Sequence, residues 1–144
     1  MKSSELLLNK IIDFEGCKLT AYKCPAGVWT IGVGHTKGVK QGQTIMKAQA
    51  MSLLKGDLLP CENYVNNLGV CKTQGQFDSL VSFSFNLGTA ALGRSTLLKY
   101  IRQGKPEQYI REEFAKWVNS KGMRLKGLII RRQWEADRYF GKEA

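Results

Sequence analysis

Glu15, Cys24 and Thr30 carry side chains that can do chemistry, and they lie within one sixteen-residue stretch. Glu15 follows Phe14 at the end of an apolar helical pattern, where partial loss of water would favour the protonated carboxyl. A protonated carboxyl is what a general acid needs to protonate a glycosidic leaving oxygen. Taken alone, a Glu at a helix end is more often a solvated surface charge.

Cys24 leaves three chemical roles open. A thiol with an ordinary pKa of about 8.5 is mostly neutral at pH 7, although its thiolate is a capable base or nucleophile. The roles are water positioning, proton acceptance and covalent attack, and beside Pro25 it can also be an inert turn cysteine. Thr30 by itself reflects strand propensity. His35, the only histidine, is expected to anchor the sheet through hydrogen bonds.

A helix followed by a small sheet must hold these residues. The helix is expected from the Ser3–Ser4 pair to Glu15, with Ser4 as its N-cap and Gly16 as its stop. From Lys18 to His35, aromatic and β-branched residues alternate with glycines. This pattern predicts a hairpin or a three-stranded sheet.

Helical periodicity resumes after the sheet and continues to the end of the chain. A first helix is expected from Thr44, a plausible N-cap, to a stop at Pro60. A second helix is capped by Thr73 and ends near Gly88.

Three further helices are expected after residue 90. One is capped by Ser95 or Thr96 and ends at Gly104, and the next has Pro106 in its first turn. The last begins after residues 122–127 and reaches Tyr139. Strands near the N-terminus followed by helices predict the α+β class.

The length of 144 residues fits a single domain. We expect residues 1–144 to form that domain, with a sheet lobe at about 17–40 and a helical lobe at about 60–144. The N-terminal helix is expected to pack with the helical lobe.

The charge favours a polyanionic partner. Lys and Arg number 22 against 12 Asp and Glu, which gives a net charge of +10. Nucleic acid, an anionic membrane surface and an acidic wall polymer all fit such a field. No helix-turn-helix or RRM-type signature accompanies the charge, so nucleic acid is not expected as a partner.

The sequence predicts no metal site, no cofactor and no membrane-spanning segment. The four cysteines form no CxxC motif, and one histidine makes a zinc site improbable. Free thiols are expected, with a Cys61–Cys71 or a Cys17–Cys24 disulfide left open. No segment approaches membrane-spanning length and the N-terminus lacks signal-peptide features, so we expect synthesis in the cytoplasm.

Three stretches of the chain carry a family resemblance. Glu15, Cys24 and Thr30 have the spacing E-x8-C-x5-T, residues 77–88 are FDSLVSFSFNLG, and residues 127–135 are GLIIRRQWE. Together they resemble the phage-type, T4-like lysozymes of glycoside hydrolase family 24. That family's catalytic signature has the same spacing, with Asp or Cys at its middle position, and the other two stretches are similar to its FxxLxSFxFNxG and GLxxRRxxE motifs.

The resemblance implies hydrolysis of the β-1,4 bond between N-acetylmuramic acid and N-acetylglucosamine. Glu15 would be the general acid, Thr30 would help to hold the attacking water, and Cys24 would take the position of the second catalytic group. Phe85 and Asn86 would bind sugar at the wall of a cleft between the two lobes. The usual scheme has two carboxylates, and here the second one is replaced by a thiol.

The implied protein is a phage or prophage endolysin, monomeric, that acts on peptidoglycan without stable membrane insertion. It would stay in the host cytoplasm until a holin or secretion partner releases it to the cell wall in the periplasm. Two alternatives stay open: a lytic transglycosylase that leaves 1,6-anhydro ends, and a non-catalytic cationic protein that binds the wall or a membrane.

The basic cluster of Arg131 and Arg132, with Arg124 and Lys126 nearby, has two interpretations. Such clusters are most often a solvated face, which would attract an anionic wall polymer or membrane. The alternative is that part of the cluster pairs internally with Glu135, at helical spacing on the same helix.

Overall fold

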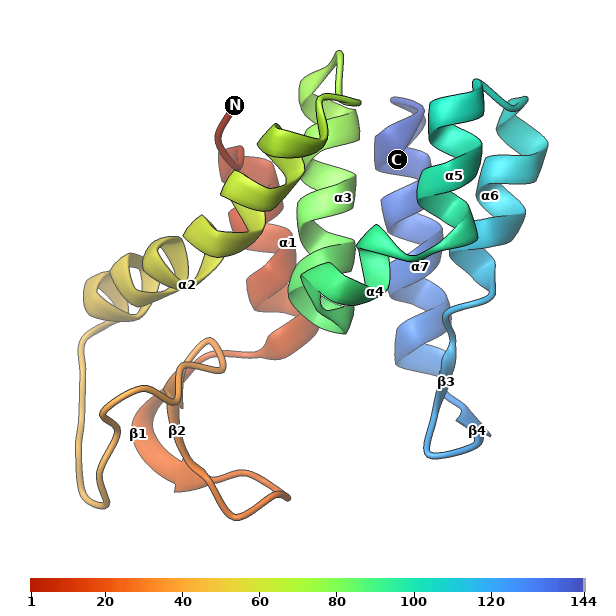
Figure 1. Ribbon diagram of the computed structural model, residues 1–144. Helices are drawn as coiled ribbons and strands as arrows, with labels where there is room; N and C mark the ends of the chain where they lie inside the picture. The colour runs from red at the N-terminus through yellow and green to blue at the C-terminus, as the bar shows by residue number, and fades with distance from the viewer. Residues whose placement is uncertain (144) are drawn as a thin grey trace. The chain divides into compact units, whose positions relative to one another are not determined.

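The computed structural model describes residues 1–143, which cluster into two units (Figure 1). One unit, here called the helical unit, consists of Met1–Ser4 and the chain from Cys61 onward. The other, here called the hairpin unit, is Glu5–Pro60. Helices combine with two small antiparallel sheets, which confirms the predicted α+β class with one small sheet near the N-terminus. The expected cleft and the expected packing of the N-terminal helix on the helical lobe stay predictions.

The hairpin unit begins with helix α1 (Glu5–Glu15). Its buried residues recur at helical spacing, as the sequence predicts, and are Leu7, Leu8 and Ile11. Gly16 ends the helix in the left-handed conformation, with φ of 77°, and its N–H donates to the Ile12 carbonyl at 2.7 Å. Glycine adopts this conformation without a steric penalty, so the predicted stop is confirmed.

Strands β1 (Lys18–Lys23) and β2 (Trp29–Gly32) form an antiparallel hairpin directly after α1 (Figure 1). In its register Tyr22 pairs with Thr30, and an irregularity follows Lys18. Single bridges join Thr20 to Thr44 and Ile31 to His35. Of the two predicted arrangements, the structure therefore has the hairpin.

Helix α2 (Lys47–Leu68) differs from its prediction at both ends. It begins after Met46, whose N–H donates to the side-chain oxygen of Gln49 at 2.8 Å. Gln49, in the first turn, thus supplies the acceptor for a backbone N–H at the start of the helix. The predicted N-cap Thr44 bridges to Thr20 instead. The helix also runs through Pro60, which is exposed.

A proline inside a helix removes one backbone hydrogen bond. Buried side chains on both sides of Pro60 favour continuation of α2, and they include Leu58, Cys61 and Val65. Packing therefore outweighs the local stop signal at this position. The predicted end at Pro60 was wrong for that reason.

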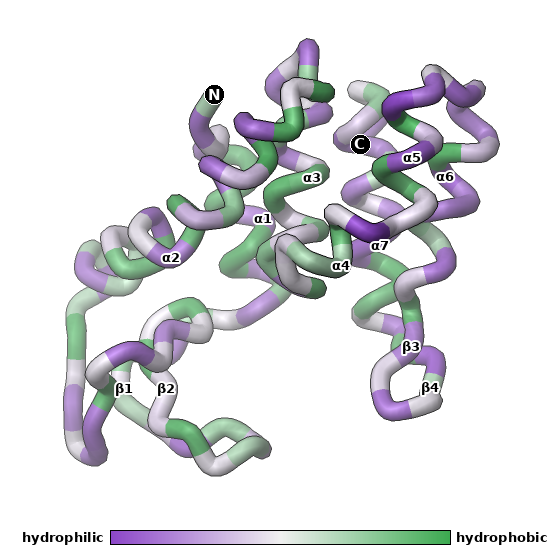
Figure 2. Tube along the Cα trace, viewed as in Figure 1, coloured by the Kyte–Doolittle hydropathy of each residue, from purple (hydrophilic) through white to green (hydrophobic). Residues whose placement is uncertain are grey.

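The helical unit contains five helices after residue 70 and a second small hairpin. The helices are α3 (Gln74–Leu87), α4 (Thr89–Gly93), α5 (Thr96–Gln103), α6 (Glu107–Ala115) and α7 (Lys126–Tyr139). Helix α7 packs against α3 and α6 (Figure 1). A Cβ on Gly75 would overlap the Arg138 carbonyl, which shows how closely α3 and α7 approach. Figure 2 shows hydrophobic residues recurring along α3.

The predicted caps of α3 and α5 are confirmed. Thr73 accepts a hydrogen bond from the Gln76 N–H at 3.1 Å, and Ser95 accepts one from the Leu98 N–H at 3.0 Å. Gly104 ends α5 with φ of 65°. Each cap involves residues only a few positions apart, so the sequence pattern contains all the information it needs.

The second hairpin was not predicted. Strands β3 (Asn119–Ser120) and β4 (Met123–Arg124) are joined by Lys121 and Gly122, whose φ angles are 51° and 78°. Two central residues with positive φ are typical of a type I′ turn. Among the described residues, no helix combines the length and the apolar character needed to span a membrane.

Candidate active site

Cys24 is held by the turn that joins β1 to β2. The Gly27 N–H donates to the Cys24 carbonyl at 2.8 Å, and the Cys24 N–H donates to the Val28 carbonyl at 3.0 Å. Ala26 has no positive φ, which fits a type I turn with Pro25 at its second position. Gly27 follows with φ of 80°, as in the three-residue hairpin loops that end in a left-handed residue.

This turn aims hydrogen-bond donors at the Cys24 sulfur. The backbone of Val28, the backbone of Ala26 and the side chain of Thr30 form hydrogen bonds that lower the pKa of the Cys24 thiol. Donors stabilise the charged thiolate more than the neutral thiol. The hairpin therefore favours the form of Cys24 that can act as a base or nucleophile.

Thr30 lies on β2 next to Cys24 and is only 3% exposed. Its hydroxyl donates to the Val28 carbonyl at 3.0 Å, and it also has a side-chain hydrogen bond with Cys24. A hydroxyl has one proton, so Thr30 donates to either the carbonyl or the sulfur at a given moment. Donation to the sulfur is favoured when Cys24 is a thiolate, because a charged acceptor makes the stronger bond.

Glu15 is the last residue of α1 and lies three positions before Lys18, where β1 begins. Its side chain is exposed, so burial does not supply the loss of water that the sequence argument invoked. The structure thus brings Cys24 and Thr30 into contact, and it places Glu15 on the neighbouring element of the same unit.

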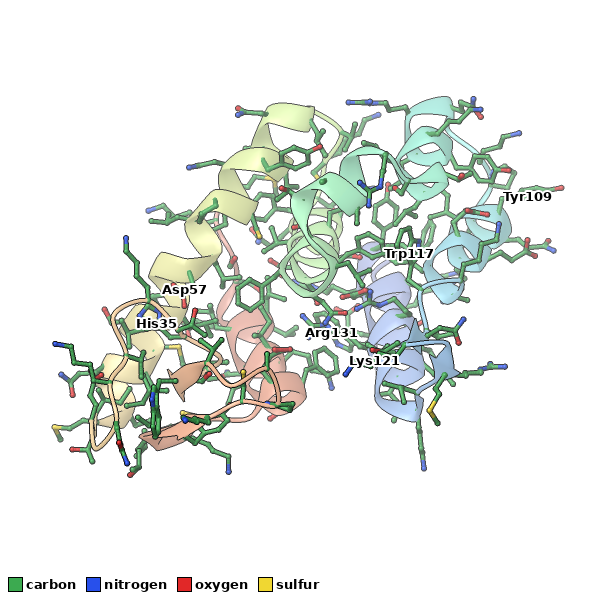
Figure 3. The ribbon with its side chains drawn as sticks, turned by 60° about the horizontal axis from the view of Figure 1, so that its bottom comes forward. His35, Asp57, Tyr109, Trp117, Lys121 and Arg131 are labelled. Carbon is green, nitrogen blue, oxygen red and sulfur yellow. The ribbon has the colours of Figure 1, made fainter. Side chains whose placement is uncertain are left out.

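His35 has the structural role that the sequence analysis expected. Its Nδ1 lies 2.8 Å from Asp57 Oδ2, and its Nε2 lies 2.9 Å from the Lys37 carbonyl (Figure 3). Asp57 is on α2, while His35 follows β2. Nδ1 therefore ties the loop after the hairpin to α2, and Nε2 contacts the backbone of the same loop.

Phe85 and Asn86 lie on α3, in the helical unit, and are half-buried. The side-chain oxygen of Asn86 accepts a hydrogen bond from Arg132 Nη2. This contact, which the sequence did not predict, fixes the orientation of the Asn86 amide and leaves its NH₂ group as the donor.

Arg131 and Arg132 form a buried ion-pair cluster with Glu135, so the expectation of a solvated basic face was wrong for these two residues, whereas Arg124 and Lys126 are exposed. Glu135 is 0% exposed, and its carboxylate lies 2.9 Å from Arg132 Nε and 3.4 Å from Arg131 Nε. The Ser82 hydroxyl donates to the same carboxylate at 2.6 Å. The internal pairing at helical spacing is confirmed, and it faces α3 because α3 supplies Ser82.

Asp78 is a second buried charge, and the sequence analysis missed it. It is 0% exposed and accepts hydrogen bonds from the Ser4 backbone, from Gln74 and from Arg138, at 3.2, 2.8 and 2.8 Å. The only signal in the sequence is an Asp among the apolar residues of α3. Gln74 is one turn earlier on the same helix, but Ser4 and Arg138 are on other parts of the helical unit, so spacing alone does not identify them.

The cysteines are free thiols, and neither disulfide left open by the sequence is formed. Burial raises the pKa of Cys61, and it raises the pKa of Cys71 to about 11. Cys24 is thus the thiol whose pKa moves in the opposite direction. Within residues 1–143, no group of His, Cys, Asp and Glu is arranged to hold a metal ion.

Comparison with known proteins gives a consistent result. The family model for phage lysozyme matches residues 12–135. An endolysin of Acyrthosiphon pisum secondary endosymbiont phage 1 is 41% identical over 140 residues, which cover 94% of this chain and 95% of that protein. The chain spans only 54% and 52% of the endolysins of Bacillus phages PZA and B103.

Solved structures agree with this family match. The endolysin from Escherichia coli O157:H7 phage FAHEc1 has a TM-score of 0.89 at 36% identity, covering 99% of this chain and 96% of that chain. The muramidase domain of SpmX from Asticaccaulis excentricus has a TM-score of 0.87 at 36% identity, covering 96% and 97%.

Proposed function

We propose a mechanism by which this chain cleaves its substrate. The chain belongs to the phage lysozyme family and is a lysozyme-type peptidoglycan hydrolase. The bond cleaved is the β-1,4 linkage between N-acetylmuramic acid and N-acetylglucosamine, and Glu15 is the general acid. The observation that carries the proposal is the hydrogen-bonded pair of Cys24 and Thr30 in the same unit as Glu15.

In this mechanism Glu15 protonates the leaving oxygen of the glycosidic bond. Its exposed position at the end of α1 leaves the carboxyl accessible to a polymer chain. A bound sugar excludes water from the carboxyl and thereby favours the protonated form that a general acid requires.

Cys24 takes the place of the second carboxylate of the usual scheme. We propose that its thiolate accepts a proton from the water that attacks the sugar, and that Thr30 stabilises the thiolate and holds this water in place. The lowered pKa of Cys24 supports this role, because it increases the fraction of thiolate near neutral pH.

Phe85 and Asn86 are proposed to bind the sugar from the helical unit. An aromatic face and an amide suit N-acetyl sugars. The contact between Asn86 and Arg132 supports the role of Asn86, because it holds the amide in one orientation with its NH₂ group as donor.

The enzyme is further proposed to work as a monomer and as one catalytic domain. It stays in the host cytoplasm until a holin or another export partner gives it access to the wall. Relatives that are described as endolysins support an action on the wall at lysis. Full-length protein in the periplasm of cells that lack any such partner would contradict the proposed route.

Mass spectrometry of muropeptides tests the reaction. Purified peptidoglycan is treated with the wild type, with Glu15→Gln, and with Asp13→Asn as a control, since Asp13 is another exposed carboxyl on α1. We expect reducing-end products from the wild type and from Asp13→Asn, and none from Glu15→Gln. Products with 1,6-anhydro ends would identify a lytic transglycosylase instead, and equal products from Glu15→Gln would contradict the role of Glu15.

The anomeric configuration of the first product separates the roles of Cys24. Attack by an activated water inverts the configuration, whereas a covalent intermediate on the thiolate retains it. NMR of the nascent reducing end should show inversion. Retention would replace proton acceptance by covalent attack.

A further inference from the structure

A groove with a volume of about 410 Å³ lies where α4 leads into α5, and all of its lining residues belong to the helical unit. Figure 1 shows α5 following α4, and Figure 2 shows a strongly hydrophilic stretch between them. The charged residues that line the groove are Arg94, Lys99 and Arg102, and all three are exposed. The volume is within the range of ligand sites, and no residue proposed for catalysis or sugar binding lines the groove.

These three groove cations have no counter-charge in the protein. Arg94 directly follows α4, while Lys99 and Arg102 are three positions apart on α5 and therefore share one face of that helix. Within residues 1–143, none of the three side chains forms a hydrogen bond or an ion pair. No Asp or Glu occurs anywhere from residue 79 to residue 106. The groove therefore has a positive field that favours an anionic ligand.

Other cations of the helical unit are neutralised by carboxylates of the same unit. Arg111 lies 2.7 Å from Glu107 and 2.6 Å from Asp137, and Lys116 is paired with Glu113. Helices α6 and α7 supply these carboxylates, whereas α4 and α5 contain none. The charge of the groove cations consequently stays available to a ligand.

The neutral part of the groove lining is polar. Thr96 and Gln103 are exposed and offer a hydroxyl and an amide, which can bind the hydroxyl groups of a ligand. In the described part of the chain, Leu98 is the only large apolar residue on the groove, and it is 2% exposed. No aromatic ring from residues 1–143 lines the groove. A ligand that fits it therefore has several negative charges and hydroxyl groups, without a large apolar surface.

We propose that the groove binds the phosphates of a polymer in which phosphodiester bonds join small polyols. Single-stranded nucleic acid has the same phosphates, but proteins bind it by stacking its bases on aromatic rings, and the groove offers none in residues 1–143. A phospholipid surface is bound by helices that insert apolar side chains, and Leu98 is buried. A polyol phosphate needs only cations, hydroxyls and amides.

This inference rests on the proposed function, because a hydrolase of peptidoglycan meets the acidic polymers of the cell wall. A second contact with the wall raises the local concentration of glycosidic bonds without changing the chemical step. Loss of the groove cations should therefore raise KM on walls that contain a polyol phosphate polymer. The same loss should leave kcat unchanged, and it should leave KM unchanged on walls from which that polymer has been removed.

Binding of a glycerol phosphate oligomer by the full chain tests the proposal. The groove variant replaces all three groove cations by Gln. A control variant removes the same charge from three other exposed cations of the helical unit that are unpaired within residues 1–143, by Lys121→Gln, Arg124→Gln and Lys126→Gln. All six side chains are exposed and unpaired, so neither variant should have a lower midpoint of thermal unfolding.

We expect the groove variant to bind the oligomer at least about tenfold more weakly than the wild type at about 150 mM salt. The control variant should lose less than about threefold, because only long-range attraction is reduced. The slope of log affinity against log salt should fall by about 2 in the groove variant, since each lost phosphate contact contributes about 0.7.

Three comparison probes identify the ligand class: oligothymidylate with the same number of phosphates, phosphatidylglycerol vesicles, and inorganic phosphate. We expect the first two to lose no more affinity in the groove variant than in the control variant. Inorganic phosphate should bind more weakly than the oligomer, because one phosphate cannot reach all three cations.

Four results would overturn the proposal. They are the absence of oligomer binding, an equal loss in both variants, a groove-specific loss for oligothymidylate or vesicles, and inorganic phosphate binding as tightly as the oligomer. The oligomer has no glycosidic bond, and the groove variant leaves Glu15, Cys24 and Thr30 intact. Failure of the binding test therefore leaves the proposed hydrolysis untouched, and failure of hydrolysis leaves the binding result valid.

Discussion

The turn around Cys24 and the contact between α3 and α7 use polar groups in opposite ways. At the turn, backbone N–H groups and the Thr30 hydroxyl are aimed at one partly exposed sulfur. Between α3 and α7, Glu135 is fully buried, and its carboxylate is ion-paired with Arg131 and Arg132 and accepts a hydrogen bond from Ser82.

This difference separates reactivity from stability in the same chain. A thiol that keeps access to solvent and has its pKa lowered by donors is available for chemistry. A buried, ion-paired carboxylate has no access to a substrate, but its loss leaves two cations unpaired in the core. The strongest charge motif of the sequence, RRQWE, therefore belongs to the scaffold.

The largest stability effect should come from Glu135→Gln. The substitution keeps the shape and removes the charge, so Arg131 and Arg132 stay buried without their carboxylate. Breaking a buried ion pair in this way costs about 3–5 kcal/mol. Urea unfolding measures the free energy of unfolding, and a loss below about 1 kcal/mol would contradict the structural role of Glu135.

Asp78→Asn should have the next largest effect, because Asp78 joins the N-terminal residue Ser4 to Arg138 on α7. The lost charge-assisted hydrogen bonds correspond to about 2–3 kcal/mol of unfolding free energy. Hydrogen exchange should also show faster exchange near the N-terminus. Unchanged exchange there, with full stability, would show that the carboxylate charge is dispensable.

Thr30→Val should lower activity more than stability. The substitution keeps the volume and removes the hydroxyl that supports the Cys24 thiolate. We expect kcat/KM on peptidoglycan to fall about tenfold, equivalent to about 1.4 kcal/mol in the barrier. Wild-type kcat/KM in this variant would remove Thr30 from the mechanism.

The pH dependence of alkylation should give the smallest but most local signal. A lowered pKa gives Cys24 more thiolate at a given pH, so its reaction with iodoacetamide should rise at lower pH than that of a free cysteine. Cys71, with a pKa of about 11, should react only in strongly alkaline solution. Peptide mass spectrometry resolves the two sites, and the reverse order would contradict the hydrogen bonds at the turn.

The sequence predicted those features whose causes are local. The caps at Thr73 and Ser95 and the stop at Gly16 each depend on a few neighbouring residues. The contact between Cys24 and Thr30 is also local, because one hairpin turn joins them.

Features with distant causes were not predicted. Continuation of α2 through Pro60 depends on the packing of its buried side chains, which a local stop signal does not contain. The burial of Arg132 depends on Asn86 and on other groups of α3, some fifty positions earlier. Periodicity gives the face of a helix but not the element that covers it.

The most direct test is to measure both kcat/KM on peptidoglycan and the free energy of unfolding for two variants. Glu15→Gln and Glu135→Gln make the same chemical change, one at the exposed end of α1 and one in the buried cluster. We predict that Glu15→Gln lowers kcat/KM by at least about a thousandfold with unfolding free energy unchanged within about 0.5 kcal/mol. Glu135→Gln should lose about 3–5 kcal/mol of stability while its folded fraction keeps its kcat/KM. Loss of stability in Glu15→Gln with activity retained would contradict the account.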